Sequence, residues 1–148
     1  RVYRRSMEDA SQLKFGDDFD NALMLYNTEV SIVLKQMIDQ RRENEQPAEH
    51  LRAILEHVTK FDYIRGDQGT VQDMRTHDFG IHPFELVQIA NLGCEELEEA
   101  KTLIPSLRAR IERGGQAEGD TLPDLDDDKL QVVLDKCASM RSFDDTVG

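Results

Sequence analysis

The side chains most often used as nucleophiles, general bases or metal ligands are few in this chain, which has four histidines and two cysteines. His50 and His57 lie two helical turns apart, too far for an adjacent pair of metal ligands, and neither an HExxH nor a CxxC motif occurs. We therefore expect these two histidines, together with His77 and His82, to be surface or half-buried residues rather than ligands.

Cys94 is the one candidate nucleophile, because it precedes an expected helix and a helix N-terminus stabilises a thiolate. Four glutamates within residues 95–99 favour the protonated thiol instead, so we expect an inert cysteine. Cys94 and Cys137 are the two cysteines of the chain, which are too few for a disulfide framework. Both lie in apolar helical patterns. This pattern indicates a reducing compartment, either the cytosol or the nucleus.

Two acidic clusters, at residues 95–99 and 124–128, carry carboxylates of the kind that bind cations. The second cluster lacks the glycine and the distal glutamate of an EF-hand loop, and both clusters fit the acidic first turn of a helix. The pair Gly114-Gly115 follows no expected strand, so it does not form a phosphate-binding loop. The sequence therefore predicts no active site, no metal and no cofactor.

Charge restricts the class of partner. The 148 residues suffice for one compact domain and contain no apolar run long enough to cross a membrane. The formal net charge is −12, and three arginines lie among the first five residues, so the rest of the chain carries −15. Such a surface repels nucleic acids and anionic lipid headgroups. We therefore expect protein partners, ideally with basic patches, and no membrane contact.

A short arm precedes the helical patterns. Residues 12–15 alternate polar and apolar side chains before Gly16, which suits a short strand or an extended arm. In such an arm, Leu13 and Phe15 project to the same side, and so short a strand needs the sheet edge of a partner. An arm folded back on its own domain fits the pattern about equally well.

The apolar patterns after Asn27 have helical spacing, beginning with a helix expected over residues 27–42. A second helix is expected from Pro47 onward. Its apolar stripe comprises Leu51, Ile54, Leu55, Val58 and Phe61. Because the stripe is continuous, we expect this helix to form the centre of the core, so that Leu55→Ala would cost about 2–5 kcal/mol.

Four further helices are expected, the first of them a short helix that Thr70 would cap. The others are expected over residues 83–92, 95–104 and 127–141, with Pro105 opening one last turn after the middle one. Together these patterns predict an all-α bundle of about five helices, preceded by a short strand or extended arm and a helix. We expect residues 1–45 to dock a partner, residues 46–143 to form the helical domain and residues 144–148 to be a tail.

One segment is specific enough to indicate a family. Residues 82–107 contain HPFELVQIANL, then GCE, then EEAKTLIPSL. This segment closely resembles the hallmark of the family of the fourth-largest subunit of RNA polymerase II, and EEAKTLIPSL is its most specific part. Weaker similarity extends to EDASQL at residues 8–13, NTEV at residues 27–30 and RSF at residues 141–143.

The resemblance implies that the bundle is HRDC-like, that is, similar to the C-terminal domain of helicases and RNase D. It also implies a non-catalytic nuclear subunit of RNA polymerase II whose arm grips the seventh subunit. The pair would form a stalk beside the RNA exit channel, supporting initiation and meeting nascent RNA only indirectly. The side chains expected to face the seventh subunit are Leu13, Phe15, Val30 and Leu34.

Two departures from the family pattern leave alternatives open. Residues 59–69 follow the aromatic and basic pattern of the family only loosely, and the loop over residues 113–126 is longer than in many members. The alternatives are the equivalent stalk subunit of polymerase I, polymerase III or a plant-type polymerase, and a free HRDC module that binds nucleic acid. The EEAKTLIPSL run favours polymerase II, and the net charge opposes the free module.

Overall fold

The computed structural model describes residues 8–16, 18–19, 22–40, 49–64, 66–114 and 123–141. These residues form seven α-helices and one 3-10 turn, η1 (Ala10–Gln12), and no strand is found among them. The predicted all-α class is confirmed. The expected domain boundaries, between residues 45 and 46 and between residues 143 and 144, lie outside the described residues.

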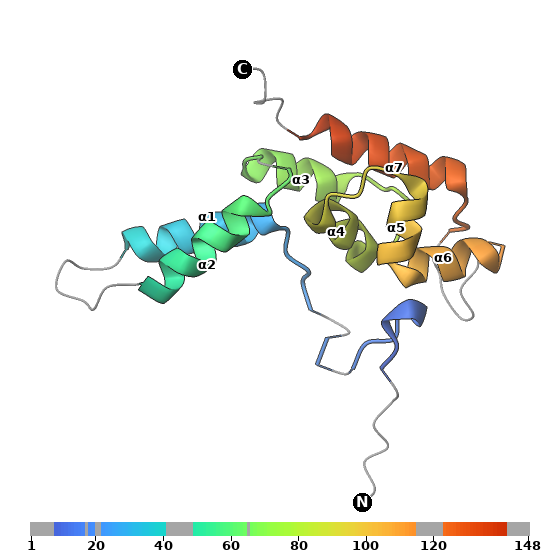
Figure 1. Ribbon diagram of the computed structural model, residues 1–148, viewed down its shortest axis with the longest axis horizontal. Helices are drawn as coiled ribbons and strands as arrows, with labels where there is room; N and C mark the ends of the chain where they lie inside the picture. Colours follow the sequence, from blue (N-terminus) through green and yellow to red (C-terminus); the bar gives the residue numbers. More distant parts are fainter. Residues whose placement is uncertain are drawn as a thin grey trace, which may run out of the picture.

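Two helices form a hairpin that projects from the rest of the molecule (Figure 1). We call α1 (Asn27–Asp39) and α2 (Glu49–Lys60) the helical hairpin. Leu34 and Leu51 are buried between them, and further apolar side chains pack partly buried against this pair, namely Val30, Ile38 and Leu55. The hairpin therefore has a small apolar cluster of its own. The first helix ends at Asp39, earlier than expected, and the expected start of the second helix at Pro47 lies outside the described residues.

The remaining helices pack around a larger core and are called the helical body (Figure 1). They are α3 (Gln68–Thr76), α4 (Pro83–Leu92), α5 (Leu97–Leu103), α6 (Pro105–Glu112) and α7 (Asp127–Ser139). Met74, Ile89, Leu107 and Leu130 are each 0% exposed and come from four different helices of this body. The main core of the described chain thus lies in α3–α7.

The expectation that the second helix forms the centre of the core is wrong. On α2, Ile54 is 47% exposed, and Phe61, just beyond the helix, is 38% exposed. The reason is tertiary: α2 packs mainly against α1, so a single neighbour covers its apolar stripe. Helix α7, in contrast, buries Leu130, Val133 and Leu134 in the body.

Helix α4 has the bounds expected from the sequence because both of its ends are fixed locally. At its start, Nδ1 of His82 accepts a hydrogen bond from the Phe84 amide at 3.2 Å, and the Glu85 carboxylate accepts one from the His82 amide at 3.1 Å. At its end, Gly93 adopts φ +67°, and a Cβ there would lie 2.7 Å from the Tyr63 ring. A larger residue at this position would be strained and would also clash.

Two helices begin at residues other than those expected. Helix α3 starts after Asp67, whose carboxylate accepts the Thr70 amide at 2.9 Å, so Asp67 and not Thr70 is the N-cap. Helix α5 starts at Leu97, two residues later than expected, because Glu96 has an extended backbone (φ −118°, ψ 150°) and is the N-cap residue. The Glu95 amide donates to the Glu99 carboxylate at 2.9 Å.

Helix α6 is longer than the single turn expected after Pro105. It continues to Glu112 because Leu107 and Arg110 both face the interior and stabilise the added turns.

A buried ion pair joins α4 and α6. The Arg110 guanidinium donates to Glu85 Oε2, and both side chains are at most 1% exposed. Arg110 Nη2 also donates to the carbonyl oxygens of Gly80, at 3.3 Å, and Pro123, at 3.0 Å. The Arg110 side chain therefore holds two helices and two loops together. The N-terminal residues pack against these same helices, α4 and α6.

Candidate partner-docking surface

The N-terminal segment, residues 8–26, begins with a closed turn rather than the expected strand. Asp9 and Lys14 exchange two backbone hydrogen bonds of 2.9 and 3.0 Å around η1, and Leu13 adopts φ +56°. The Asp9 carboxylate accepts hydrogen bonds from the amide and the hydroxyl of Ser11, and the hydroxyl bond lowers the pKa of Asp9. Because the backbone of Leu13 lies in the left-handed region, the side chains of residues 12–15 do not alternate between two sides as they would in a strand.

Phe15 packs on the helical body. Its ring centroid lies 4.9 Å from that of Phe84 and 5.8 Å from that of His82. The preceding turn η1 packs on α6, and both Leu13 and Phe15 are half-buried. In this structure the arm is therefore folded back on its own domain, which is the second of the two arrangements that the sequence allows.

Residues 22–26 run in an extended conformation toward α1 and are clamped by Arg75 of α3. Arg75 Nε donates to Glu29 Oε1 at 3.0 Å, and its Nη2 donates to Glu29 Oε2 at 2.6 Å and to the Met24 carbonyl oxygen at 2.7 Å. The guanidinium also lies 5.2 Å from the ring centroid of Tyr26. This bidentate pair fixes the point at which the N-terminal segment enters the hairpin.

Asn91 of α4 provides a second clamp. Its Oδ1 accepts the Asn27 amide at 2.9 Å, and its Nδ2 donates to the Leu25 carbonyl oxygen at 3.1 Å. Close by, Thr28 Oγ1 donates to Asp62 Oδ1 at 2.6 Å in a buried site. The NTEV and HPFELVQIANL segments, 64 residues apart at this contact, therefore meet. No sequence pattern singles out Arg75, but the occurrence of the two segments in one family resemblance could have suggested their contact.

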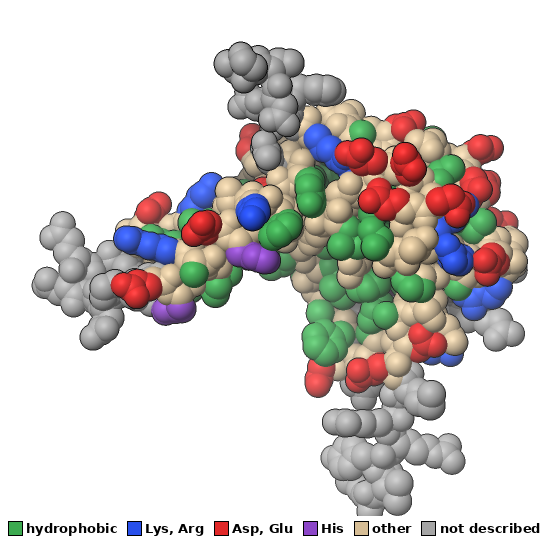
Figure 2. Space-filling view, in the orientation of Figure 1, with side chains coloured by type: hydrophobic (Ala, Val, Ile, Leu, Met, Phe, Trp, Pro, Cys, Tyr) green, Lys and Arg blue, Asp and Glu red, His purple; other side chains and the backbone are tan. Residues whose placement is uncertain are grey.

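Large apolar side chains are exposed on the N-terminal segment and the hairpin. Leu23 is 70% exposed, the largest value among them. The others on these elements are Phe19, Leu25, Val33, Met37 and Ile54. Figure 2 shows hydrophobic side chains at the centre of one face of the body, whereas acidic side chains predominate on the α5 and α7 side. Where such side chains form a contiguous patch rimmed by polar residues, they are typical of a protein-docking surface.

The four side chains expected to face a partner lie in two separate places. Leu13 and Phe15 lie on the N-terminal segment, where Phe15 contacts Phe84. Val30 and Leu34 lie in the hairpin cluster, where they pack with Leu51 of α2. Their contact with a partner stays a prediction.

Both cysteines, including the candidate nucleophile Cys94, are buried. Cys94 and Cys137 are 0% and 2% exposed, and burial raises the pKa of both thiols, that of Cys137 to about 11. The Glu99 carboxylate adds to the rise at Cys94, as the sequence suggested, but burial is the larger cause. In the described ranges, no three histidine, cysteine or acidic side chains are grouped as a metal would require. Over the same ranges, no helix has the length and apolarity to span a membrane.

Comparison with known proteins finds relatives along nearly the whole chain. Residues 24–141 match the family model described as RNA polymerase Rpb4. The "DNA-directed RNA polymerase II subunit rpb4" of Schizosaccharomyces pombe is 34% identical over 142 residues, which cover 93% of this chain and 95% of that protein. The protein of the same description in Dictyostelium discoideum is 29% identical, covering 92% and 90% of the two chains. "DNA-directed RNA polymerase II subunit 4" of Arabidopsis thaliana is 28% identical, covering 93% and 96%.

Proposed function

The chain belongs to the RNA polymerase Rpb4 family, and we propose from this membership that it is a non-catalytic subunit of RNA polymerase II. The observation that carries the proposal is the extent of the similarity. Three relatives named as polymerase II subunits each align with at least 90% of their own length and at least 92% of this chain. The similarity therefore spans the N-terminal segment, the hairpin and the body together. By the same reasoning, the protein acts in the nucleus.

The finer part of the proposal is that the chain pairs with the seventh subunit to form the stalk of the polymerase. The exposed apolar side chains of the N-terminal segment and the hairpin support it, since burial against a partner would remove them from water. Leu13, Phe15, Val30 and Leu34 are the contacts proposed first. In this pair the chain supports initiation and handles the emerging transcript.

The charge of the body supports an indirect role in RNA handling. Acidic side chains predominate over α5 and α7, where they repel a phosphate backbone (Figure 2). The pair, rather than this chain alone, would then contact RNA. The HRDC-like description of the body is part of the same proposal.

The experiment is affinity purification of the tagged chain from cells of its own organism, with the largest polymerase subunits identified by mass spectrometry. Each nuclear polymerase has a different largest subunit, so the result assigns the chain to one enzyme. We expect the largest subunit of polymerase II, together with the seventh subunit. Recovery of the largest subunit of polymerase I or III instead, or of none, would overturn the proposal.

A further inference from the structure

The helical hairpin and the helical body have separate apolar clusters (Figure 1). The hairpin cluster consists of side chains of α1 and α2, and the main core contains no residue of either helix. Among the described residues, none therefore belongs to both clusters. Burial of apolar surface stabilises each unit, but it does not fix the angle between the two units.

Two connections of the chain join the hairpin to the body, and they lie side by side. In the first, Tyr26 is 1% exposed in the main core, and Asn27 begins α1. In the second, Phe61 follows α2, and Ile64 is 3% exposed in the same core. Asn27 Nδ2 donates to the Phe61 carbonyl oxygen at 2.9 Å, so both connections leave the body at one place. Short segments at the ends of helices are where hinges between packed units are found.

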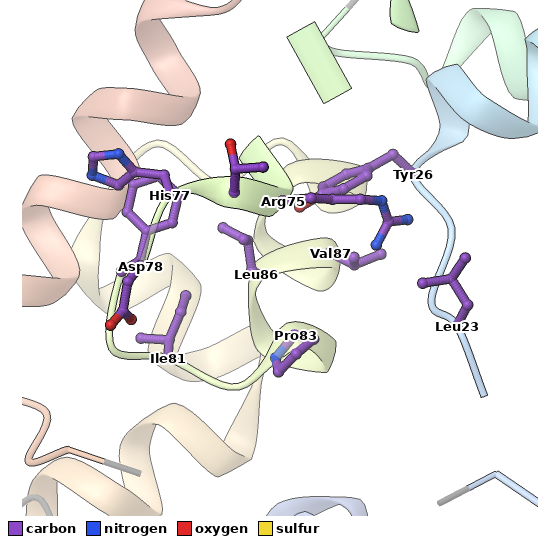
Figure 3. A pocket seen from close by; sticks show the side chains of 11 residues that line it. Leu23, Tyr26, Arg75, His77, Asp78, Ile81, Pro83, Leu86 and Val87 are labelled. Atoms are coloured by element: carbon purple, nitrogen blue, oxygen red, sulfur yellow. The ribbon is translucent and has the colours of Figure 1, made fainter. Parts of the chain in front are cut away.

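One ion pair joins a helix of the body to a helix of the hairpin in the described part of the chain. Arg75, on α3, donates from Nε and Nη2 to the two carboxylate oxygens of Glu29, on α1. Figure 3 shows the Arg75 side chain beside Tyr26, at the first connection. The guanidinium fork matches a carboxylate in one relative orientation, so the closed pair specifies one position of α1 on α3.

Water reaches this ion pair, because the side chains of Arg75 and Glu29 are 22% and 20% exposed. When the pair opens, both charged groups can be hydrated where they are. Neither apolar cluster has to open at the same time, since no cluster crosses the junction. Opening is therefore a local change, and salt favours it by screening the attraction between the two charges.

We propose that the Arg75–Glu29 pair is a latch that sets the angle of the helical hairpin, and that the hairpin turns as a unit about the two connections when the latch opens. Arg75 Nη2 also donates to the Met24 carbonyl oxygen at 2.7 Å, so opening frees Met24 from α3 as well. The latch thereby couples the position of the N-terminal segment to the angle of the hairpin. This motion belongs to the chain by itself and does not depend on the proposed function.

The test measures the distance between two spin labels on the full chain by double electron–electron resonance. One label is attached at Lys35→Cys, an exposed position of α1, and the other at Val132→Cys, a 61% exposed position of α7. Cys94 and Cys137 are both buried, and a chain without the added cysteines shows whether the reagent labels them. The wild-type sequence at low salt should give a single narrow distribution of distances.

Two substitutions open the latch in different ways. Arg75→Met removes the guanidinium, and Glu29→Gln removes the charge but keeps an oxygen for the Tyr26 amide, which Glu29 accepts at 2.8 Å. Each should broaden the distribution and shift its mean, and high salt should broaden that of the wild type in the same direction. Arg108→Met is the matched control, because Arg108 is exposed on α6 and should leave the distribution unchanged.

A wild-type mean and width in both latch variants would overturn the proposal. A broad distribution in the wild type at low salt would also overturn it, because the pair would then not set the angle. Circular dichroism compares the helical content of all the samples. If Arg75→Met has lost helicity, the result for Glu29→Gln decides, since that variant keeps the bond at the start of α1.

Discussion

The rings of Phe15 and Phe84 lie 4.9 Å apart, so a side chain expected to reach a partner packs on α4 of its own chain. Phe84 is the second residue of α4, and its amide is held by His82. The N-terminal turn and the start of α4 are therefore one packed unit. A partner that binds Phe15 must first separate it from Phe84, so its own contact with Phe15 must be the more favourable in free energy.

The double variant Leu13→Asp with Phe15→Asp should lose its association with the seventh subunit, because two charges replace the apolar face of the turn. Co-purification after co-expression measures this, with Val132→Asp as a control at a 61% exposed apolar side chain of α7, outside the proposed docking surface. The structure adds a second expectation: loss of the Phe15 contact should lower body stability by less than about 3 kcal/mol, since the ring is only half-buried. Partner yield and salt resistance equal to wild type would refute the docking role of the arm.

The buried pair of Glu85 and Arg110 should show strong coupling in urea denaturation. Arg110→Met leaves a carboxylate uncompensated in the core, so it should cost about 3–5 kcal/mol. Adding Glu85→Leu removes that charge and should restore most of the loss. Arg108→Met is the control, since Arg108 is exposed and, within the described ranges, its guanidinium donates to Thr102 Oγ1 alone. Equal destabilisation by the single and double variants would contradict the account of this pair.

Leucines of the hairpin and of the body should differ in their contribution to stability. Leu130 is 0% exposed in the main core, so Leu130→Ala should cost about 2–5 kcal/mol. Leu55 is only partly buried against the small hairpin cluster, so Leu55→Ala should cost less than about 2 kcal/mol. Chemical denaturation of both variants tests the order. If Leu55→Ala lost more free energy of unfolding than Leu130→Ala, the main core would lie at α2 and not in the body.

Stability should fall at alkaline pH because buried acids resist ionisation, and the shifts are large at Cys137 and Tyr26. Burial raises the pKa of Cys137 from 9.0 to about 11 and that of Tyr26 from 10.0 to about 12. Since the unfolded state loses these protons first, their contribution is complete below pH 9 and decreases as pH rises toward 12. Urea midpoints between pH 8 and pH 11 should therefore decline, and less steeply in Cys137→Ala. An identical pH dependence in that variant would rule out the thiol as a cause.

The sequence predicted the elements whose ends are fixed by neighbouring residues. Helix α4 has its expected bounds because Pro83, the His82–Glu85 cap and Gly93 act within a few residues of each other. The buried stripe of α7 was also predicted, since Leu130, Val133 and Leu134 follow helical spacing. Local signals of this kind need no knowledge of the tertiary structure.

The features that the sequence did not predict depend on contacts between distant residues. The apolar stripe of α2 is continuous, yet only α1 covers it, and no pattern within α2 reveals how many neighbours it has. Arg75 bonds to Glu29, which lies 46 residues earlier in the chain, so no pattern around either residue reveals the pair. The folded-back arm was one of two arrangements that fitted residues 12–15 equally well, and the packing of Phe15 on Phe84 and of η1 on α6 distinguishes them.

The most direct measurement is size-exclusion chromatography with light scattering on the chain co-expressed with the seventh subunit of RNA polymerase II from the same organism. The account predicts a single peak with the mass of a one-to-one complex, which persists on dilution and contains both chains. Two separate peaks at the masses of the individual chains would contradict it.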